Sequence, residues 1–275
     1  MMLRTLLPVM LLVVLPYGAT STATEAFDHG YTDYAQLLAR HVDGARVAYA
    51  ALKADRAALD RVIAQFDASA ARGEAAWTRE QRMAFWINAY NAFTLRAIVD
   101  HYPIPSPWFT LLPRNSIRQI DGVWTRLTWP VAGRPVTLDD IEHKILRPVF
   151  HDARIHFAIN CASVSCPPLA AGPYRDQALD TQLDAAARRY LGSPEGLQMD
   201  GDTIRVSSIL DWYGEDFVPR YAPLIAGERS AKDKAILGVI TTHGSADAAT
   251  RAARGNSKIA FLKYDWSLND SGARR

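Results

Sequence analysis

The segment from residue 156 to residue 168 holds the side chains of this chain that are best suited to covalent chemistry. It contains both cysteines, Cys161 and Cys166, with a histidine, an asparagine and two serines, and it ends in two prolines. A cysteine thiolate is a nucleophile that can form an acyl-enzyme with an amide or ester substrate. The same pair can instead close a small disulfide loop, which is the usual state of paired cysteines in an oxidising compartment. The sequence leaves both possibilities open.

Cys161 is the predicted nucleophile. It follows a short apolar run that favours a buried strand, whereas Cys166 is tied to the prolines that shape the next turn. A thiol of this kind requires a base or a positive neighbour, and His143 and His156 are the candidate bases. On an extended strand, His156 and Cys161 would point to opposite faces because an odd number of positions separates them. This favours His143 as the base.

Amide and hydroxyl side chains supply the other predicted contacts of the site. Asn160 and Ser163 would lie beside the thiol, where a donor stabilises a developing oxyanion. Asn88 and Asn91 share one face of a predicted helix, and they either bind backbone or line a substrate amide site. Backbone binding is preferred for Asn91, and both roles stay open for Asn88. The predicted substrate-binding residues are Asn88, Asn91, Ser163 and Cys166. The candidates for orienting the base are Glu142, Asn88, Asn91, Asn160 and Asp265.

The spacing of the sulfur and imidazole groups does not favour a metal site. His156, Cys161 and Cys166 are evenly spaced, whereas structural zinc sites use tighter cysteine pairs and need further ligands. A thiol–disulfide redox protein is also disfavoured, because the sequence lacks the Cys-x-x-Cys pairing that tunes such sites. We therefore predict no metal and no cofactor.

Hydrophobic periodicity predicts a mixture of helices and strands around this segment. The alternation at 155–159 predicts a strand that leads to Cys161. Residues 78–81 resemble a capping box at the start of the longest helix, and Thr137 with Asp140 suggests a second cap. Helices are predicted at 33–41, 55–66, 78–98, 138–146, 177–190 and 233–242. The other strands are predicted at 124–129, 134–136, 203–206 and 258–264.

These elements favour a single α+β domain over residues 24–275, with N-terminal helices packed on a small mixed or antiparallel sheet. A hydrophobic content of 49% and seven tryptophans are typical of a well-packed globular chain. The net charge of +2 and the lack of a basic stripe with interleaved aromatics give no reason to expect a nucleic-acid partner.

The first 23 residues have the layout of a secretory signal peptide. Arg4 and the amino terminus supply positive charge, residues 6–15 form a short apolar core, and residues 17–23 are small and polar. The apolar core is shorter than the roughly 20 residues that cross a bilayer, so we expect no integral membrane segment after cleavage. The predicted location is periplasmic or secreted.

Several strings in this chain resemble, in the same order, those of domain-of-unknown-function family 547. They are 84–92 (AFWINAYNA), 101–103 (HYP), 138–143 (LDDIEH), 154–167 (RIHFAINCASVSCP) and 264–269 (YDWSLN). The resemblance covers almost the whole chain after the signal peptide. The resemblance implies that relatives occur among exported bacterial proteins and also in plants. It implies no established activity for this chain. In relatives that occupy a reducing cytosol the two cysteines would not form a disulfide, so their presence would need another explanation.

The predicted function is a thiol-dependent hydrolase or acyl transferase that acts on a peptide-like or amide substrate in the cell envelope. The alternative is a non-catalytic binding or scaffold module that a Cys161–Cys166 disulfide stabilises. In the second case the partner is an unidentified envelope ligand.

Export leads to a first testable prediction. Because the charged start and apolar core are removed with a signal peptide, the mature protein should begin between Thr22 and Phe27. N-terminal sequencing of the soluble protein from an exporting host checks this. Recovery of intact Met1 in the soluble fraction would show that the segment is not cleaved.

Overall fold

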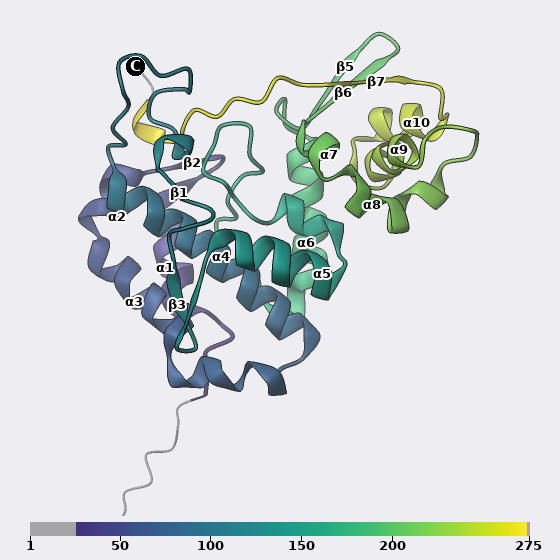
Figure 1. The fold of residues 1–275 in the computed structure, drawn as a ribbon. Helices are drawn as coiled ribbons and strands as arrows, with labels where there is room; N and C mark the ends of the chain where they lie inside the picture. Colours follow the sequence, from purple (N-terminus) through teal and green to yellow (C-terminus); the bar gives the residue numbers. More distant parts are fainter. Residues whose placement is uncertain (1–25, 274–275) are drawn as a thin grey trace, which may run out of the picture.

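Helix α4 (Arg79–His101) runs through the middle of the molecule, and the other N-terminal helices pack around it (Figure 1). The structure is a computed structural model that describes residues 26–273. The signal peptide predicted at 1–23 lies outside the described residues. Between residues 26 and 273, no helix is both long and apolar enough to cross a bilayer.

The helices predicted in the N-terminal third of the chain are confirmed, with small shifts at their ends. They are α1 (Thr32–His41), α3 (Arg56–Asp67) and α4, and a short unpredicted helix, α2 (Tyr49–Ala54), lies between the first two. The capping box is also present. The Gln81 N–H donates to Thr78 Oγ1 at 3.1 Å, and the Thr78 N–H donates to Gln81 Oε1 at 3.0 Å. These bonds satisfy two of the free N–H groups at the start of α4.

Helix α4 is enclosed on all sides. Every residue from 83 to 95 is buried, which is the pattern of a helix at the centre of a core rather than at a surface. Phe93 stacks on Trp129 with ring centroids 5.3 Å apart, and Phe66 packs edge-on against both Phe85 and Phe93. A helix in this position must find internal partners for any polar side chain it carries.

The strands form three small, separate sheets, and the predicted α+β class is confirmed. Two are hairpins, β1 (Val42–Asp43) with β2 (Arg46–Val47) and β3 (Trp129–Val131) with β4 (Arg134–Val136). The third joins β5 (Leu197–Asp200) antiparallel to β6 (Thr203–Val206), which pairs in parallel with β7 (Lys258–Phe261). The strand predicted at 124–129 is wrong except for its last residue. The chain from 121 to 126 forms turns instead.

The C-terminal half builds a second hydrophobic cluster beside the first. The predicted helices at 177–190 and 233–242 are confirmed, whereas three short helices were not predicted. The helices of this half are α6 (Leu179–Leu191), α7 (Ile209–Trp212), α8 (Gly214–Tyr221), α9 (Ala231–His243) and α10 (Ala246–Ala253). In α9, a side chain at Gly238 would collide with the Tyr221 carbonyl, so only glycine allows this contact with α8.

The segment from residue 262 to residue 270 crosses back from β7 to the N-terminal part of the molecule (Figure 1). Leu268 forms an antiparallel bridge with Ser163, and Asp270 forms a parallel bridge with Val47. This segment therefore connects the two clusters and lies against the loop that contains the cysteines.

The strand predicted at 155–159 is wrong. Residues Ala153–Phe157 form a 3-10 helix, η4, in which the Arg154 N–H donates to the capping side chain of Asp152. All residues from 153 to 160 are buried. The alternation in the sequence therefore does not mark a buried and an exposed face. A strand prediction from alternation depends on such a difference between faces.

The helix predicted at 138–146 has a different hydrogen-bond pattern from the one expected. Residues Asp140–Leu146 form a π-helix, η3, which continues into α5 (Arg147–Phe150). The predicted cap is present, since the Asp140 N–H donates to Thr137 Oγ1 and Thr137 Oγ1 donates to Asp140 Oδ2. π-Helical turns often occur at functional sites.

Arg154 connects η4 to α6 through buried ion pairs. Its side chain is 4% exposed and donates to Asp152 at 2.7 Å and to Asp184 at 2.6 Å. Arg220 lies 4.0 Å from the same Asp152 carboxylate, but its side chain is 50% exposed. The two arginines therefore differ both in burial and in how closely they contact carboxylates.

The difference in burial predicts a difference in stability. Arg154→Met should lower the free energy of unfolding by about 3–5 kcal/mol, because it leaves a buried carboxylate without its partner. Arg220→Met should cost less than about 1 kcal/mol, as expected for an exposed ion pair. Urea denaturation of both variants measures this, and equal losses would show that Arg154 does not anchor η4.

Candidate functional site

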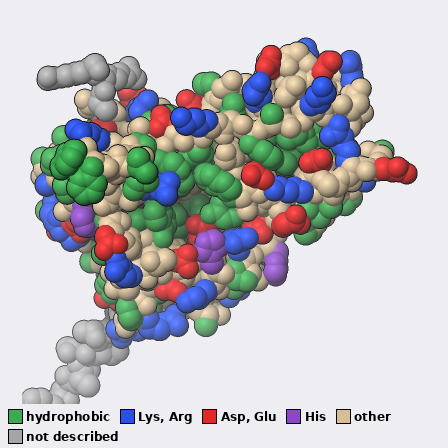
Figure 2. Space-filling view, turned by 45° about the horizontal axis from the view of Figure 1, so that its top comes forward, with side chains coloured by type: hydrophobic (Ala, Val, Ile, Leu, Met, Phe, Trp, Pro, Cys, Tyr) green, Lys and Arg blue, Asp and Glu red, His purple; other side chains and the backbone are tan. Residues whose placement is uncertain are grey.

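A cavity of about 430 Å³ lies where the two hydrophobic clusters meet. Figure 2 shows hydrophobic side chains around a hollow on this part of the surface, with acidic and histidine side chains at its edge. The cavity is lined by segments that are far apart in the sequence. They include α4, η3, α7, residues 264–266 and the loop at residues 160–167, which we call the cysteine loop. It contains four of the eight residues predicted for the site, which are His143, His156, Cys161 and Cys166.

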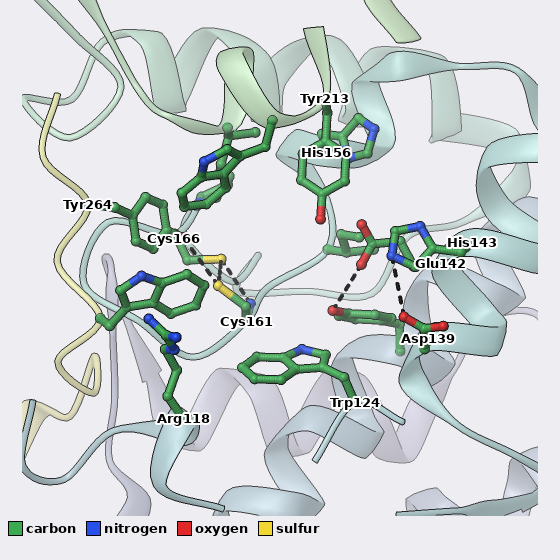
Figure 3. Close-up of a pocket in the computed structure, with 16 residues that line it drawn as sticks. Arg118, Trp124, Asp139, Glu142, His143, His156, Cys161, Cys166, Tyr213 and Tyr264 are labelled. Atoms are coloured by element: carbon green, nitrogen blue, oxygen red, sulfur yellow. Dashed lines mark hydrogen bonds and ion pairs between the residues drawn. The ribbon is translucent and has the colours of Figure 1, made fainter. Parts of the chain in front are cut away.

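The two cysteines lie together on one wall of the cavity (Figure 3). Their sulfurs are 2.8 Å apart, and both thiols are free. This distance is longer than the roughly 2.05 Å of a disulfide bond. The Cys161 N–H also donates to Cys166 Sγ at 2.8 Å. Cys166 is buried, whereas Cys161 is partly exposed and is the more accessible of the two.

Two hydroxyl groups surround the Cys161 sulfur. Ser163 Oγ lies 3.2 Å and Tyr264 Oη 3.3 Å from Cys161 Sγ, and the two hydroxyl oxygens are 3.1 Å apart. Burial and the nearby Cys161 sulfur raise the pKa of Tyr264 well above its ordinary value. Tyr264 therefore keeps its proton and can donate it to a thiolate.

The surroundings of Cys161 favour the thiolate. Burial raises its pKa, but hydrogen bonds from Cys166, Ser163 and Tyr264 outweigh this effect and lower the pKa to about 7. Cys166 shifts in the opposite direction. Its burial and the adjacent Cys161 sulfur raise the pKa of Cys166 well above its ordinary value. The pair therefore consists of one acidic thiol and one that stays protonated.

The Asn160 side chain stabilises the cysteine loop through hydrogen bonds to the loop backbone. Its Oδ1 accepts the Ala162 N–H at 2.8 Å, and its Nδ2 donates to the Pro167 carbonyl at 2.7 Å. Ala162 has a φ of 58°, a left-handed conformation that is unusual for a residue with a side chain. Both ends of the amide are thus used by the backbone, and Asn160 is not among the residues that line the cavity.

Asn88 and Asn91 also bind backbone. Asn88 exchanges two hydrogen bonds with the backbone of Tyr174, at 2.8 and 2.9 Å. Asn91 donates to the Ala158 carbonyl at 3.0 Å and accepts the Asn160 N–H at 2.8 Å. Neither asparagine lines the cavity. Their contacts attach α4 to the segments on either side of the cysteine loop.

The two histidines lie at the cavity, but neither forms a hydrogen bond with Cys161. Arg147 donates to His143 Nδ1 at 2.8 Å, so the His143 proton resides on Nε2, which is 3.5 Å from Asp139 Oδ1. The His156 side chain is 1% exposed, and its Nε2 lies 2.8 Å from Asp216 Oδ2. His156 also stacks on Tyr213 with ring centroids 4.0 Å apart, so it forms part of the packing behind the cavity.

A carboxylate faces the thiols from the other side of the cavity (Figure 3). Glu142 is 5% exposed, and its Oε2 accepts a hydrogen bond from Tyr90 Oη at 3.4 Å. The hydroxyl of Tyr213 is directed toward the same carboxylate (Figure 3). Trp124 and Trp266 add aromatic walls, and the Arg118 guanidinium lies over the Trp266 ring at 5.1 Å.

The sequence pattern does not indicate several of these groups. It suggests Glu142 only as a candidate for orienting a histidine, and it predicts no site role for Tyr264, Arg118, Tyr90 or Tyr213. The 264–269 string, which is part of the family resemblance, is the one feature of the sequence that points to the segment containing Tyr264. Among the residues that the structure describes, no three acidic, histidine or cysteine side chains come together as a metal site would require.

The fold and the cavity define an α+β protein with a paired-cysteine site between two hydrophobic clusters. Residues 75–191 match the model of a family described as a protein of unknown function, DUF547. Over residues 75–191 the match confirms the resemblance drawn from the sequence, and this part contains both asparagines of α4, His143 and the cysteine loop. Tyr213 and Tyr264, which complete the cavity, lie beyond it. No curated protein and no solved structure matches the chain.

The pKa difference between the two thiols can be measured by alkylation with iodoacetamide. One thiol should react rapidly, at a rate that rises as the pH increases through about 7 and then levels off as Cys161 becomes fully ionised. Cys161→Ser should remove this fast phase. Tyr264→Phe, which deletes one donor, should move the midpoint to higher pH. A midpoint near the ordinary value of about 8.5 in the native protein would contradict a lowered pKa.

Proposed function

We propose that the protein is a thiol-dependent hydrolase or acyl transferase that acts on the carbonyl group of an amide or peptide-like substrate. The observation that supports this most directly is the environment of Cys161, whose sulfur lines the cavity and has a pKa of about 7. A thiol with this pKa is largely ionised just above neutral pH, without a histidine in contact with it. We place the reaction in the cell envelope because of the predicted signal peptide.

In the first half of the proposed reaction, the Cys161 thiolate attacks the substrate carbonyl carbon. The C–N bond of the amide breaks, and the acyl group remains on Sγ as a thioester. The departing amine needs one proton, which we assign to Cys166. Its thiol lies 2.8 Å from Cys161 Sγ and is protonated at neutral pH because its pKa is raised. The Cys161 N–H, which points at Cys166 Sγ, stabilises the thiolate that remains.

In the second half, water or an amine attacks the thioester carbonyl. The Cys166 thiolate takes a proton from this nucleophile, the C–S bond breaks, and Cys161 leaves as a thiolate. The cycle returns both sulfurs to their starting states without an oxidant or a reductant. With water the net reaction is hydrolysis, and with an amine it is acyl transfer.

His143 fits this scheme as a hydrogen-bond donor rather than as the base for the thiol. Its Nδ1 is occupied by Arg147, which can only donate. Its Nε2 lies 3.5 Å from Asp139 Oδ1 at the rim of the cavity, and in this scheme the Nε2–H turns from that carboxylate to donate to the substrate carbonyl. In this scheme the thiol is ionised by Ser163, Tyr264 and Cys166 instead.

The second candidate function is a binding module without catalysis. The 2.8 Å separation of the sulfurs favours it, because a small closure of the loop would form a disulfide in an oxidising compartment. The aromatic cavity would then bind a ligand without reacting with it. This candidate requires that protein isolated from the cell envelope contains no free thiol.

Acylation by p-nitrophenyl acetate tests the catalytic proposal. Intact-mass analysis should find one acetyl group per chain in the native protein and none in Cys161→Ser. Cys166→Ser, assayed well above the pKa of Cys161, should keep this acylation, since p-nitrophenolate leaves without a proton. The same variant should cleave an amide about 100-fold more slowly, which is within the range expected for the loss of a proton donor.

The outcomes separate the two candidates. Protein that is not acylated and has no thiol to titrate would favour the binding module. Protein that is acylated equally in the native form and in Cys161→Ser would remove Cys161 from the mechanism.

A further inference from the structure

Glu142 is a buried carboxylate with an unsatisfied oxygen beside the cavity. Its Oε2 accepts from Tyr90 Oη at 3.4 Å, and the Tyr213 hydroxyl is directed toward the carboxylate, but Oε1 is buried and forms no hydrogen bond within 3.5 Å among the described residues. The neighbouring cation, Arg147, is engaged by Asp216 through two bonds of 2.6 and 2.9 Å. A carboxylate that is removed from water needs a donor or a positive charge to offset the cost of burial.

The walls of the cavity suit a positive charge. Aromatic rings attract cations through their electron-rich faces. Trp124 and Tyr213 flank the space between the sulfurs and Glu142, and Tyr264 lies on the other side of the sulfurs (Figure 3). One ring of the same cavity already carries a cation, since the Arg118 guanidinium lies over Trp266.

Cys161 lies across the cavity from Glu142, so a single ligand can approach both groups (Figure 3). As a thiolate, Cys161 adds a second negative charge to the same space. Asp139, the other carboxylate of the lining, is 41% exposed and lies beside His143. Negative groups thus lie on two sides of the cavity. Arg118 is the one lysine or arginine in the lining, and it is stacked on Trp266.

We propose that Glu142 binds a primary ammonium group of the substrate, so that the cavity selects amides that carry a free amine. The substrate half of this statement rests on the proposed function, whereas the ammonium site itself does not. In this arrangement the ammonium donates to Glu142 and contacts the aromatic rings while the carbonyl carbon lies at Cys161. An acetylated or otherwise neutral amine loses the charge that Glu142 recognises.

The experiment measures binding rather than turnover. The full chain with Cys161→Ser is titrated with leucinamide and 6-aminohexanamide, and with the N-acetyl form of each, by calorimetry and tryptophan fluorescence. At least one free amine should bind more tightly than its acetylated form, by 10-fold or more. Adding Glu142→Gln should remove this preference, because it replaces a charged hydrogen-bond acceptor by a neutral one of the same shape, a loss of roughly 10- to 100-fold.

Asp139→Asn is the matched control, because it neutralises a more exposed carboxylate of the same cavity. It should leave the preference for the free amine almost unchanged. Glu142→Gln should also keep or raise the melting temperature, since it removes a buried and incompletely paired charge. Retention of the preference in Glu142→Gln, or equal binding of free and acetylated amines by the Cys161→Ser chain, would overturn the proposal.

These outcomes are independent of those for catalysis. Selective binding of the free amine without any acyl-enzyme would leave the ammonium site standing in a non-catalytic protein. Acylation of Cys161 without selective binding would leave the thiol mechanism standing and remove Glu142 as a determinant of the substrate.

Discussion

The geometry of the thiol site depends on one buried side-chain amide. Asn160 bonds to Ala162 and to Pro167, so it ties the two ends of the cysteine loop to each other, and its own N–H bonds to Asn91 of α4. These bonds hold Ala162 in a left-handed conformation that costs on the order of 1–2 kcal/mol for a residue with a side chain. Without them the loop would relax, and the two sulfurs would lose the contact that makes one thiol acidic and the other basic.

The rest of the fold supplies the surroundings of this loop. Helix α4 forms one side of the cavity with Tyr90 and anchors the loop through Asn91, which is possible because α4 is buried all round. The segment after β7 forms another side. Ser116 donates to the Trp266 carbonyl, and the Leu268 N–H donates to Asn115, so this segment is held against the loop between α4 and η3. Tyr264 thereby reaches the Cys161 sulfur although it lies 103 residues away in the sequence.

The two negative groups of the proposed site, the Cys161 thiolate and the Glu142 carboxylate, have different surroundings in the cavity. The hydrogen bonds around Cys161 stabilise a negative sulfur, whereas one oxygen of the buried Glu142 carboxylate, Oε1, forms no hydrogen bond among the described residues. Arg147 directs two hydrogen bonds to Asp216, which His156 also contacts, and it forms no hydrogen bond with Glu142 among the described residues. His156, a candidate base in the sequence, thus contributes to the proposed site by holding Asp216 and packing on Tyr213.

The sequence by itself determined the α+β class, the long central helix with its cap, and the segment where the thiols lie, because these depend on local periodicity and on residue type. It also determined that Cys161 and Cys166 are neighbours, since only a short loop separates them. Only the tertiary structure decided which groups surround them. The alternating segment at 155–159 begins in a 3-10 helix, and the argument that used strand faces to choose between the histidines therefore does not apply. Tyr264, Tyr213 and Glu142 come to the cavity from three distant segments, and the hydrogen bonds and burial that set the pKa of Cys161 exist only once those segments pack together.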